Sequence, residues 1–242
     1  MNLYFVPNDP EQTTLVSANG IAQYRIMTSK AGAFRSPAIT RISRPADTAA
    51  NSIVGEIEWR RWHTHPVVRS NVFDGREQTI EIRELLYKLG STFSTARFFL
   101  GNDNEEYRWK YAKGSGYIVS SLFSALSKHS ILTTDTFHPS AHPLLYCSSH
   151  FLYIHHRVYP QLTHRNTGAE VARHIQETVN EGYFCGERRW CLRLRPSMLD
   201  IDLIVLTFII LEKRRLDKAN GDDSDDEPAE AVCEVGTEMG CA

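Results

Sequence analysis

A run of nine residues, Leu203 to Leu211, constrains the fold of this chain more than any other feature of its sequence. Every residue of the run except Thr207 is strongly apolar. Acidic residues come just before it and Lys213-Arg214-Arg215 comes just after it, an order of charges that suits a helix dipole. A helix that is apolar on every side must be buried on every side. The run is too short to cross a bilayer, which takes roughly 20 apolar residues. We therefore expect a helix over 199–215 that the rest of the chain encloses.

Short segments of alternating apolar and polar residues, separated by turn residues, precede this helix. Ile21 to Met27 follows the tight-turn pair Asn19-Gly20, and in 106–112 three aromatic residues alternate with Arg108 and Lys110. Alternation of period two indicates half-buried antiparallel strands, and about ten such strands precede the helix. A sheet closed around the helix would bury both and leave no open edge. The sequence predicts a mainly β fold, a closed antiparallel β-barrel around a central hydrophobic C-terminal α-helix.

One segment, residues 119–161, breaks this style. Asp135 is its only acidic residue, and it shows no clean period. It could be a functional insertion loop, although structureless loops of this length are uncommon in compact domains. We also interpret it as a retained intron. The usual first six bases of an intron, GTAAGT, would be translated as Val-Ser, as at Val119-Ser120. The usual intron end, a pyrimidine-rich stretch followed by CAG, would be compatible with Tyr159-Pro160-Gln161. Removing the segment joins Ile118 to Leu162 and leaves a strand, a turn and a strand.

The charge of the chain is unevenly distributed. Residues 221–242 contain eight acids and no Lys or Arg, which leaves 27 basic and 21 acidic residues in the rest of the chain. Few large apolar residues follow Lys218, so we expect a barrel domain over 1–217 and a disordered acidic tail over 218–242. A basic body can meet an anionic partner such as lipid headgroups or nucleic acid, and ordinary solubility is the alternative.

The cysteines and the first residues suggest a compartment. Five cysteines, at 147, 185, 191, 233 and 241, are an odd number without paired spacing, as expected for reduced thiols. The segment from Met1 to Pro10 has no basic region of the kind that opens a signal peptide. We expect an intracellular, cytoplasmic protein without a transmembrane segment, able to lie at a membrane surface.

Several stretches resemble a known family. They are Leu3-Tyr4-Phe5, Gly55-Glu56-Ile57-Glu58-Trp59, Tyr107-Arg108-Trp109-Lys110, Gly168 to Arg173 and Leu199 to Arg215. The run Asp202 to Phe208 is the most specific of them. With these residues the chain resembles an uncharacterised family of fungal proteins, common in mushroom-forming fungi. The domain of that family is similar to the tubby C-terminal-like superfamily, which also holds the LURP-one-related and phospholipid scramblase proteins.

The resemblance covers most of residues 1–217 except 119–161, which the family pattern lacks. It implies a twelve-stranded barrel around a central C-terminal helix. Tubby-type domains bind phosphoinositides and scramblases associate with membranes, but no motif in this chain matches a lipid-contacting residue of those proteins. The function therefore has to be argued from the residues of this chain.

The segment 188–195 offers a basic and aromatic surface. If Leu192 and Leu194 face the helix, Arg189, Arg193 and Arg195 share the outer face of one strand. Such a row can hold phosphate groups through forked hydrogen bonds. The alternative is an ordinary solvated strand face. We take these three arginines as candidate ligand-binding residues.

Signals for catalysis are weak. His63-Thr64-His65 puts two imidazoles on one face of a strand, yet two ligands alone do not make a metal site. Cys185 and Cys191 are too far apart for a redox pair. No phosphate loop, nucleophile elbow or metalloprotease motif occurs. We expect no catalytic residue, no metal and no cofactor, and an enzyme with a metal on His63 and His65 is the weakest alternative.

These observations predict a non-enzymatic binding protein. Its partner would be an anionic phospholipid headgroup of the phosphoinositide type at a membrane surface, and we expect no nucleic acid. The alternative is a protein-interaction module whose acidic tail is the regulated element.

Overall fold

A computed structural model describes residues 1–29, 37–45, 52–59, 65–73, 76–90, 94–113 and 158–219. By the density of its contacts the chain divides into two units, Met1–Ala112 with Tyr159–Ala242, and Lys113–Val158. The first unit holds nearly all of the described residues, including the whole sheet core and the long C-terminal helix.

Twelve strands and two helices make up the described chain. The strands are β1 (Asn2–Val6), β2 (Gln12–Val16), β3 (Ala22–Ser29), β4 (Ala38–Ser43), β5 (Ile53–Trp59), β6 (Val67–Ser70), β7 (Gln78–Glu81), β8 (Arg97–Leu100), β9 (Glu106–Lys113), β10 (Val158–His164), β11 (Glu170–Thr178) and β12 (Arg188–Leu194). The helices are α2 (Ile82–Leu85) and α4 (Ile201–Ala219). The expected helix is thus confirmed, but it begins at Ile201, two residues later than expected, and runs further to Ala219.

All twelve strands form one sheet, in the order β7-β6-β5-β4-β3-β2-β1-β12-β11-β10-β9-β8. Neighbours in this order are also neighbours in the chain, except at one place. There β1 pairs antiparallel with β12, with Leu3 opposite Leu192 and Tyr4 opposite Cys191. This pairing brings the first and the last strand together in the middle of the sheet.

The hydrogen-bonded ladder of this sheet is open, which corrects the expectation of a closed barrel. The sheet ends at β7 and β8, which have four residues each, and no ladder joins them within the described residues. The chain between the two strands forms α2 and then a single bridge, in which Tyr87 and Phe98 exchange backbone hydrogen bonds of 3.0 and 2.9 Å. Because α2 occupies the seam, the two edge strands do not pair directly.

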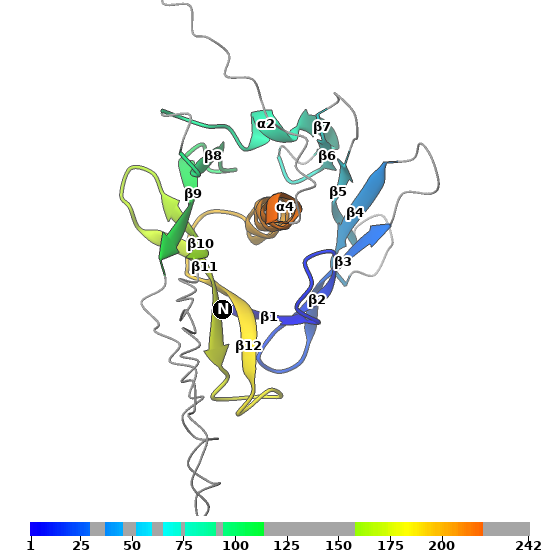
Figure 1. Cartoon of the computed structure of the whole chain (residues 1–242), viewed down its shortest axis with the longest axis vertical. Helices are drawn as coiled ribbons and strands as arrows, with labels where there is room; N and C mark the ends of the chain where they lie inside the picture. Colours follow the sequence, from blue (N-terminus) through cyan, green and yellow to red (C-terminus); the bar gives the residue numbers. More distant parts are fainter. Residues whose placement is uncertain are drawn as a thin grey trace, which may run out of the picture. The chain divides into compact units, whose positions relative to one another are not determined.

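Helix α4 lies inside the curve of the sheet, as Figure 1 shows with the helix seen end-on and the strands around it. Residues Asp202 to Glu212 of α4 are all buried, and Trp109, Phe99 and Leu3 are among the fully buried side chains of the sheet. Fully burying one such side chain contributes about 1.5–3 kcal/mol. The apolar run therefore forms the centre of the hydrophobic core, as its sequence predicted.

Thr207 is the one polar residue inside the apolar run, and its hydroxyl has partners. It accepts a hydrogen bond from Trp109 Nε1 at 3.1 Å and donates to the carbonyl of Leu203 at 2.8 Å. A buried hydroxyl without partners would cost about 1–3 kcal/mol. Thr207 thus ties α4 to β9 without that penalty.

The predicted insertion 119–161 is described only at its end. Strand β10 begins at Val158, so Tyr159, Pro160 and Gln161 belong to the sheet, where Gln161 lies opposite Arg173 of β11. Residues 119–157 lie outside the described residues, and so does the predicted acidic tail from residue 220 onward. The retained-intron interpretation therefore stays a prediction.

Candidate functional site

The outward side of β9–β12 gathers basic side chains, and we call this set the outer basic face. On each of these strands one set of alternate residues faces the core, and Trp109, Leu162, Ala172 and Leu192 belong to these sets and are buried with α4. The residues between them must therefore point outward. The outer basic face consists of Arg108 and Lys110 on β9, Arg173 on β11, Arg193 on β12 and Arg195 just beyond β12.

Strand register brings these side chains together. Arg173 lies directly opposite Arg193, and Gln161 lies opposite Arg173 on its other side. Arg195 continues the ladder past β12, since its backbone N–H donates to the carbonyl of Val171 at 2.9 Å. Like charges directly opposite each other on neighbouring strands are destabilising. Arg173 and Arg193 therefore need either a counter-charge or a ligand.

Two carboxylates supply part of that counter-charge. Glu177 forms an ion pair with Arg193, and Glu170 lies between Arg173 and Arg195, with its Oε1 3.0 Å from Arg195 Nε. Burial alone would raise the pKa of Glu170, but the hydrogen bond from Arg195 and the charge of Arg173 outweigh it and lower that pKa. The Glu170 carboxylate is thus held in the charged form.

The face keeps an excess of positive charge. With Arg189 of β12, the outward side of these strands carries six basic side chains and three carboxylates, those of Glu106, Glu170 and Glu177, so its net charge is +3. Arg108 and Lys110 form no ion pair with any carboxylate of the described residues. An excess of this sign on four neighbouring strands attracts anions.

A second polar network lies where α4 begins. Asp202 is buried, and its two oxygens accept hydrogen bonds of 2.7 Å from the Tyr24 hydroxyl and from Arg44 Nη1. Burial raises the pKa of Asp202, and the bonds from Tyr24 and Arg44 oppose that shift. The network fastens β3 and the end of β4 to the helix.

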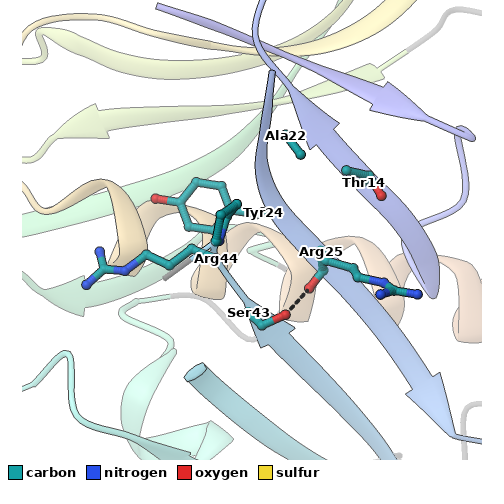
Figure 2. Close-up of a pocket in the computed structure, with 7 residues that line it drawn as sticks. Thr14, Ala22, Tyr24, Arg25, Ser43 and Arg44 are labelled. Carbon is teal, nitrogen blue, oxygen red and sulfur yellow. Dashed lines mark hydrogen bonds between the residues drawn. The ribbon is translucent and has the colours of Figure 1, made fainter. Parts of the chain in front are cut away.

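A pocket of about 400 Å³ lies beside this network. It is lined by Thr14, Ala22, Tyr24, Arg25, Ser43, Arg44 and Pro45. Figure 2 shows that the side chains of Arg25 and Arg44 point away from each other. They therefore do not form a clamp for one anion, and the pocket is a weaker candidate than the outer basic face.

The comparisons with known proteins bear on this chain as a whole. A family model described as "Family of unknown function (DUF6593)" matches residues 8–217, which is most of the chain. The chain belongs to the DUF6593 family. Comparison with curated proteins gave no match, and comparison with solved structures gave none. The matched range includes both the outer basic face and α4.

The structure places the three predicted arginines of this DUF6593 chain in two groups. Arg193 and Arg195 lie on the outer basic face. Arg189 points outward from the same strand, but its guanidinium lies 4.3 Å from the ring centre of Phe184 and forms an ion pair with Glu187. Between these groups the loop 179–187 covers Cys191, which is fully buried with Tyr4, Val16, Val179 and Phe184 in an outer cluster.

Sequence reasoning missed three members of the outer basic face of this DUF6593 chain. The alternation in 106–112 already put Arg108 and Lys110 on one side of a strand, but it did not show which strands would lie beside it. Arg173 lies in a segment whose pattern suited either a strand or a short helix. Only the pairing of β11 with β12 shows that Arg173 and Arg193 meet.

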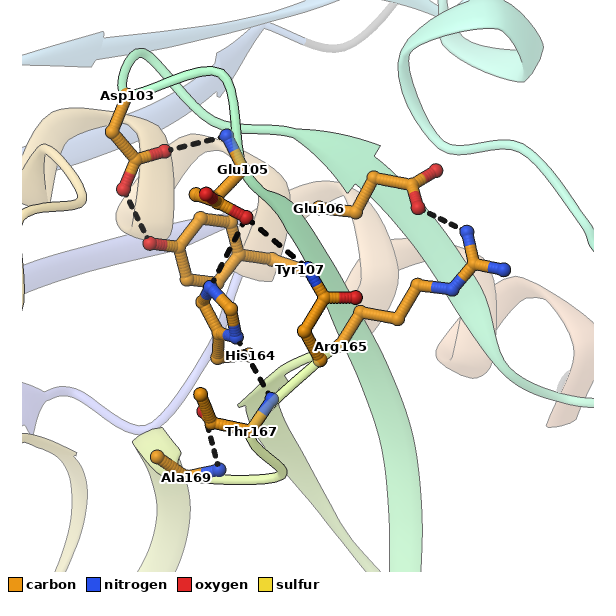
Figure 3. Close-up of polar contacts among 9 residues, drawn as sticks. Asp103, Glu105, Glu106, Tyr107, His164, Arg165, Thr167 and Ala169 are labelled. Carbon is orange, nitrogen blue, oxygen red and sulfur yellow. Dashed lines mark hydrogen bonds and ion pairs between the residues drawn. The ribbon is translucent and has the colours of Figure 1, made fainter.

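A histidine and carboxylate cluster lies at the turns that join β8 to β9 and β10 to β11, and Figure 3 shows it. His164 Nε2 is 3.5 Å from Glu105 Oε2, and His164 Nδ1 accepts the backbone N–H of Thr167 at 3.2 Å. The Tyr107 hydroxyl donates to Asp103 at 2.5 Å. All of these contacts close the two turns, so the cluster is best explained as structural.

The described residues of this DUF6593 chain offer neither a metal site nor a membrane-spanning helix. His65 is described, with its Nε2 3.0 Å from Arg83 Nη1, whereas His63 lies outside the described residues. In the described part of the chain no group of three His, Cys, Asp or Glu side chains could hold a metal ion. None of the helices described has both the length and the hydropathy that a bilayer span requires.

Proposed function

We propose that this protein is a non-enzymatic binding protein whose outer basic face docks on anionic phospholipid headgroups at a membrane surface. The observation that carries the proposal is the net charge of +3 on the outward side of β9–β12, where Arg108 and Lys110 have no carboxylate partner among the described residues. A phosphate near Arg108 and Lys110 would supply the counter-charge that the described carboxylates do not, and a guanidinium can hold a phosphate through forked hydrogen bonds. Each basic residue near an anionic leaflet contributes about 1 kcal/mol, so the binding would be reversible and sensitive to salt.

We also infer that the fold is a tubby-like barrel. The twelve strands in one sheet and the buried helix α4 support this inference, because the resemblance noted above implies both. The seam between β7 and β8 is filled by Ile82, Leu85 and Leu86, which are all buried in the main core. On this proposal the barrel is closed by side-chain packing where the hydrogen-bonded ladder stops.

Vesicle sedimentation tests the lipid proposal. The full chain should bind vesicles of phosphatidylcholine more tightly as phosphatidylserine or a phosphoinositide is added, and salt should weaken that binding. The double variant Arg195→Gln with Lys110→Gln removes two positive charges and should lower the affinity by roughly 25-fold, about fivefold for each charge.

Arg69→Gln is the matched control, because Arg69 is an exposed arginine paired with Glu58 on β6, far along the sheet from β9–β12. It should leave vesicle binding unchanged. If the affinity of the unaltered chain neither rises with anionic lipid nor falls with salt, the lipid proposal is wrong.

The alternative of a protein-interaction module regulated by the acidic tail rests on residues after Ala219, which the structure does not describe, and it stays a prediction.

A further inference from the structure

Two large side chains, Ile21 and Tyr183, are exposed on two loops that contact each other. Tyr183 is 77% exposed in the loop 179–187, and Ile21 is 60% exposed just after the turn that joins β2 to β3. The two loops are joined, since the backbone N–H of Tyr183 donates to the carbonyl of Ala18 at 2.9 Å. We call the pair of loops, with Ile21 and Tyr183 on it, the apolar tip.

Glycine makes the junction of the two loops possible. A Cβ atom on Gly182 would lie 2.2 Å from the carbonyl oxygen of Ala18, and the φ of Gly182 is +87°. Only glycine avoids both the clash and the strain. Gly20 on the other loop also has a positive φ and lies against the Tyr183 side chain. The apolar tip is therefore a defined structure that depends on two glycines.

The loop 179–187 buries other apolar residues, so the exposure of Tyr183 does not result from a loop that fails to pack. Phe184 is 5% exposed and Val179 is 2% exposed, and both pack into the outer cluster with Tyr4. Backbone hydrogen bonds of 2.8 and 2.9 Å join Val179 to Gly186 and Glu187. The loop thus buries the ring of Phe184 and exposes the ring of its neighbour Tyr183.

The loop 179–187 of the apolar tip lies on the same side of β12 as the outer basic face. Both lie on the outward side of β12, where Arg189 beneath the loop and Arg193 are four residues apart, roughly 13 Å along a strand. Arg188 forms no ion pair with a carboxylate of the described residues, whereas Arg189 is paired with Glu187. Glu181 in the same loop is exposed and opposes contact with an anionic surface.

We propose that the apolar tip inserts Tyr183 and Ile21 into the interfacial layer of an anionic bilayer while the outer basic face contacts the headgroups. This inference rests on the proposed function and names the part of the lipid that the tip contacts. A bilayer fits the tip because tyrosine suits the boundary between headgroups and acyl chains, and because the adjacent surface carries the charge that anionic headgroups require.

Vesicle partitioning of full-length variants tests the inference. The double variant Ile21→Ser with Tyr183→Ser should lower partitioning onto phosphatidylcholine and phosphatidylserine vesicles on the order of tenfold. Glu181→Gln should raise it several-fold, because it removes a negative charge from the tip. Met198→Ser is the matched control, since Met198 is 83% exposed but lies outside both loops, and it should have no effect.

A probe in the loop supplies an independent readout. Cys185 is exposed in the loop and Cys191 is buried, so with Cys147, Cys233 and Cys241 replaced by Ser an environment-sensitive dye will label Cys185. Its emission should shift to the blue when phosphatidylserine vesicles are added.

If the unaltered chain binds these vesicles while the double serine variant binds equally well and the dye does not shift, the inference is overturned and the lipid function stands. If the unaltered chain does not bind, the lipid function itself fails and takes the inference with it.

Discussion

At the residue scale, His174 lies among aromatic rings inside the sheet. Its ring centroid is 4.8 Å from that of Trp190, 4.9 Å from that of Phe208 and 5.2 Å from that of Phe5. Burial, with a smaller effect from the charge of Arg215, lowers the pKa of His174 to about 3. The imidazole is therefore neutral in the folded protein at neutral pH and acts as part of the core.

This pKa predicts a loss of stability in acid. The unfolded chain binds a proton on this histidine below a pKa of about 6.5, whereas the folded chain does so only near 3, so each pH unit between these values costs about 1.4 kcal/mol. Urea unfolding should show that lowering the pH from about 7.5 to about 5 costs the unaltered protein about 2 kcal/mol more than it costs His174→Phe.

Other buried groups do not confuse the comparison. Burial raises the pKa of Asp202 and of Glu212, which gives a pH dependence of the opposite sign, but both groups are present in the two proteins. Only the difference between the two proteins in how the free energy of unfolding depends on pH reports on His174. If the two curves are parallel, this histidine does not titrate differently in the folded and unfolded states.

At the scale of elements, the pairing of β9 with β10 bears on the predicted insertion 119–161. The backbone N–H of Arg165 donates to the carbonyl of Glu106 at 2.8 Å, and the Thr163 hydroxyl lies 3.4 Å from the carbonyl of Arg108. Antiparallel partners step in opposite directions, so Gln161 falls near Lys110. In a chain without 119–161, Ile118 would take that place and leave a turn of about three residues, a common hairpin length.

We therefore predict that the chain lacking 119–161 folds with the same sheet. Shortening the connection lowers the entropy cost of closing it, which should add about 2 kcal/mol of stability. Urea unfolding followed by circular dichroism measures this. A deletion of residues 115–164 removes all of β10 and also the residues that could take its place, and it should not fold. If the chain lacking only 119–161 is unfolded, the segment is needed and is no intron, and transcripts that mostly retain it would lead to the same conclusion.

The strands show where local pattern is informative and where it is not. Alternation predicted the inward Trp190, Leu192 and Leu194 of β12, since side chains on a strand must alternate between faces. It did not predict that Cys191, on the outward side, is fully buried. That burial depends on the loop 179–187 folding back over the sheet, and no period in the sequence records such a contact.

At the scale of the whole molecule, α4 is the shared core of all the strands, so a charge inside it should prevent folding. Val205 is fully buried, and Val205→Asp would place an unpaired carboxylate there at a cost of several kcal/mol. Domains are stable by only about 5–15 kcal/mol. We expect the variant to be insoluble or unfolded by circular dichroism. Ile201→Asp, at the 38% exposed start of the same helix, is the control and should fold; normal folding of Val205→Asp would contradict the central position of α4.

The general plan of the fold could be predicted because one constraint dominates it. A fully apolar helix such as Leu203 to Leu211 must be enclosed by the rest of the chain. The rest of this chain consists mainly of short strands, so a sheet has to enclose it. The open seam at β7 and β8 could not be predicted, since it depends on α2 taking the place of a pairing strand. Nor could the outer basic face, because Arg173 and Arg193 meet only through strand register.

The position of α4 after all twelve strands affects how the protein must be made. A ribosome synthesises the sheet first and its core last. Until α4 emerges, the inner faces of the strands have nothing to pack against. Strand β1, at the start of the sheet-forming chain, also waits for its partner β12, the last strand to be synthesised. Non-local pairing of this kind is slow and leaves apolar surface exposed to aggregation. The yield of folded protein should therefore depend on synthesis speed and on chaperones that cover the unfinished sheet.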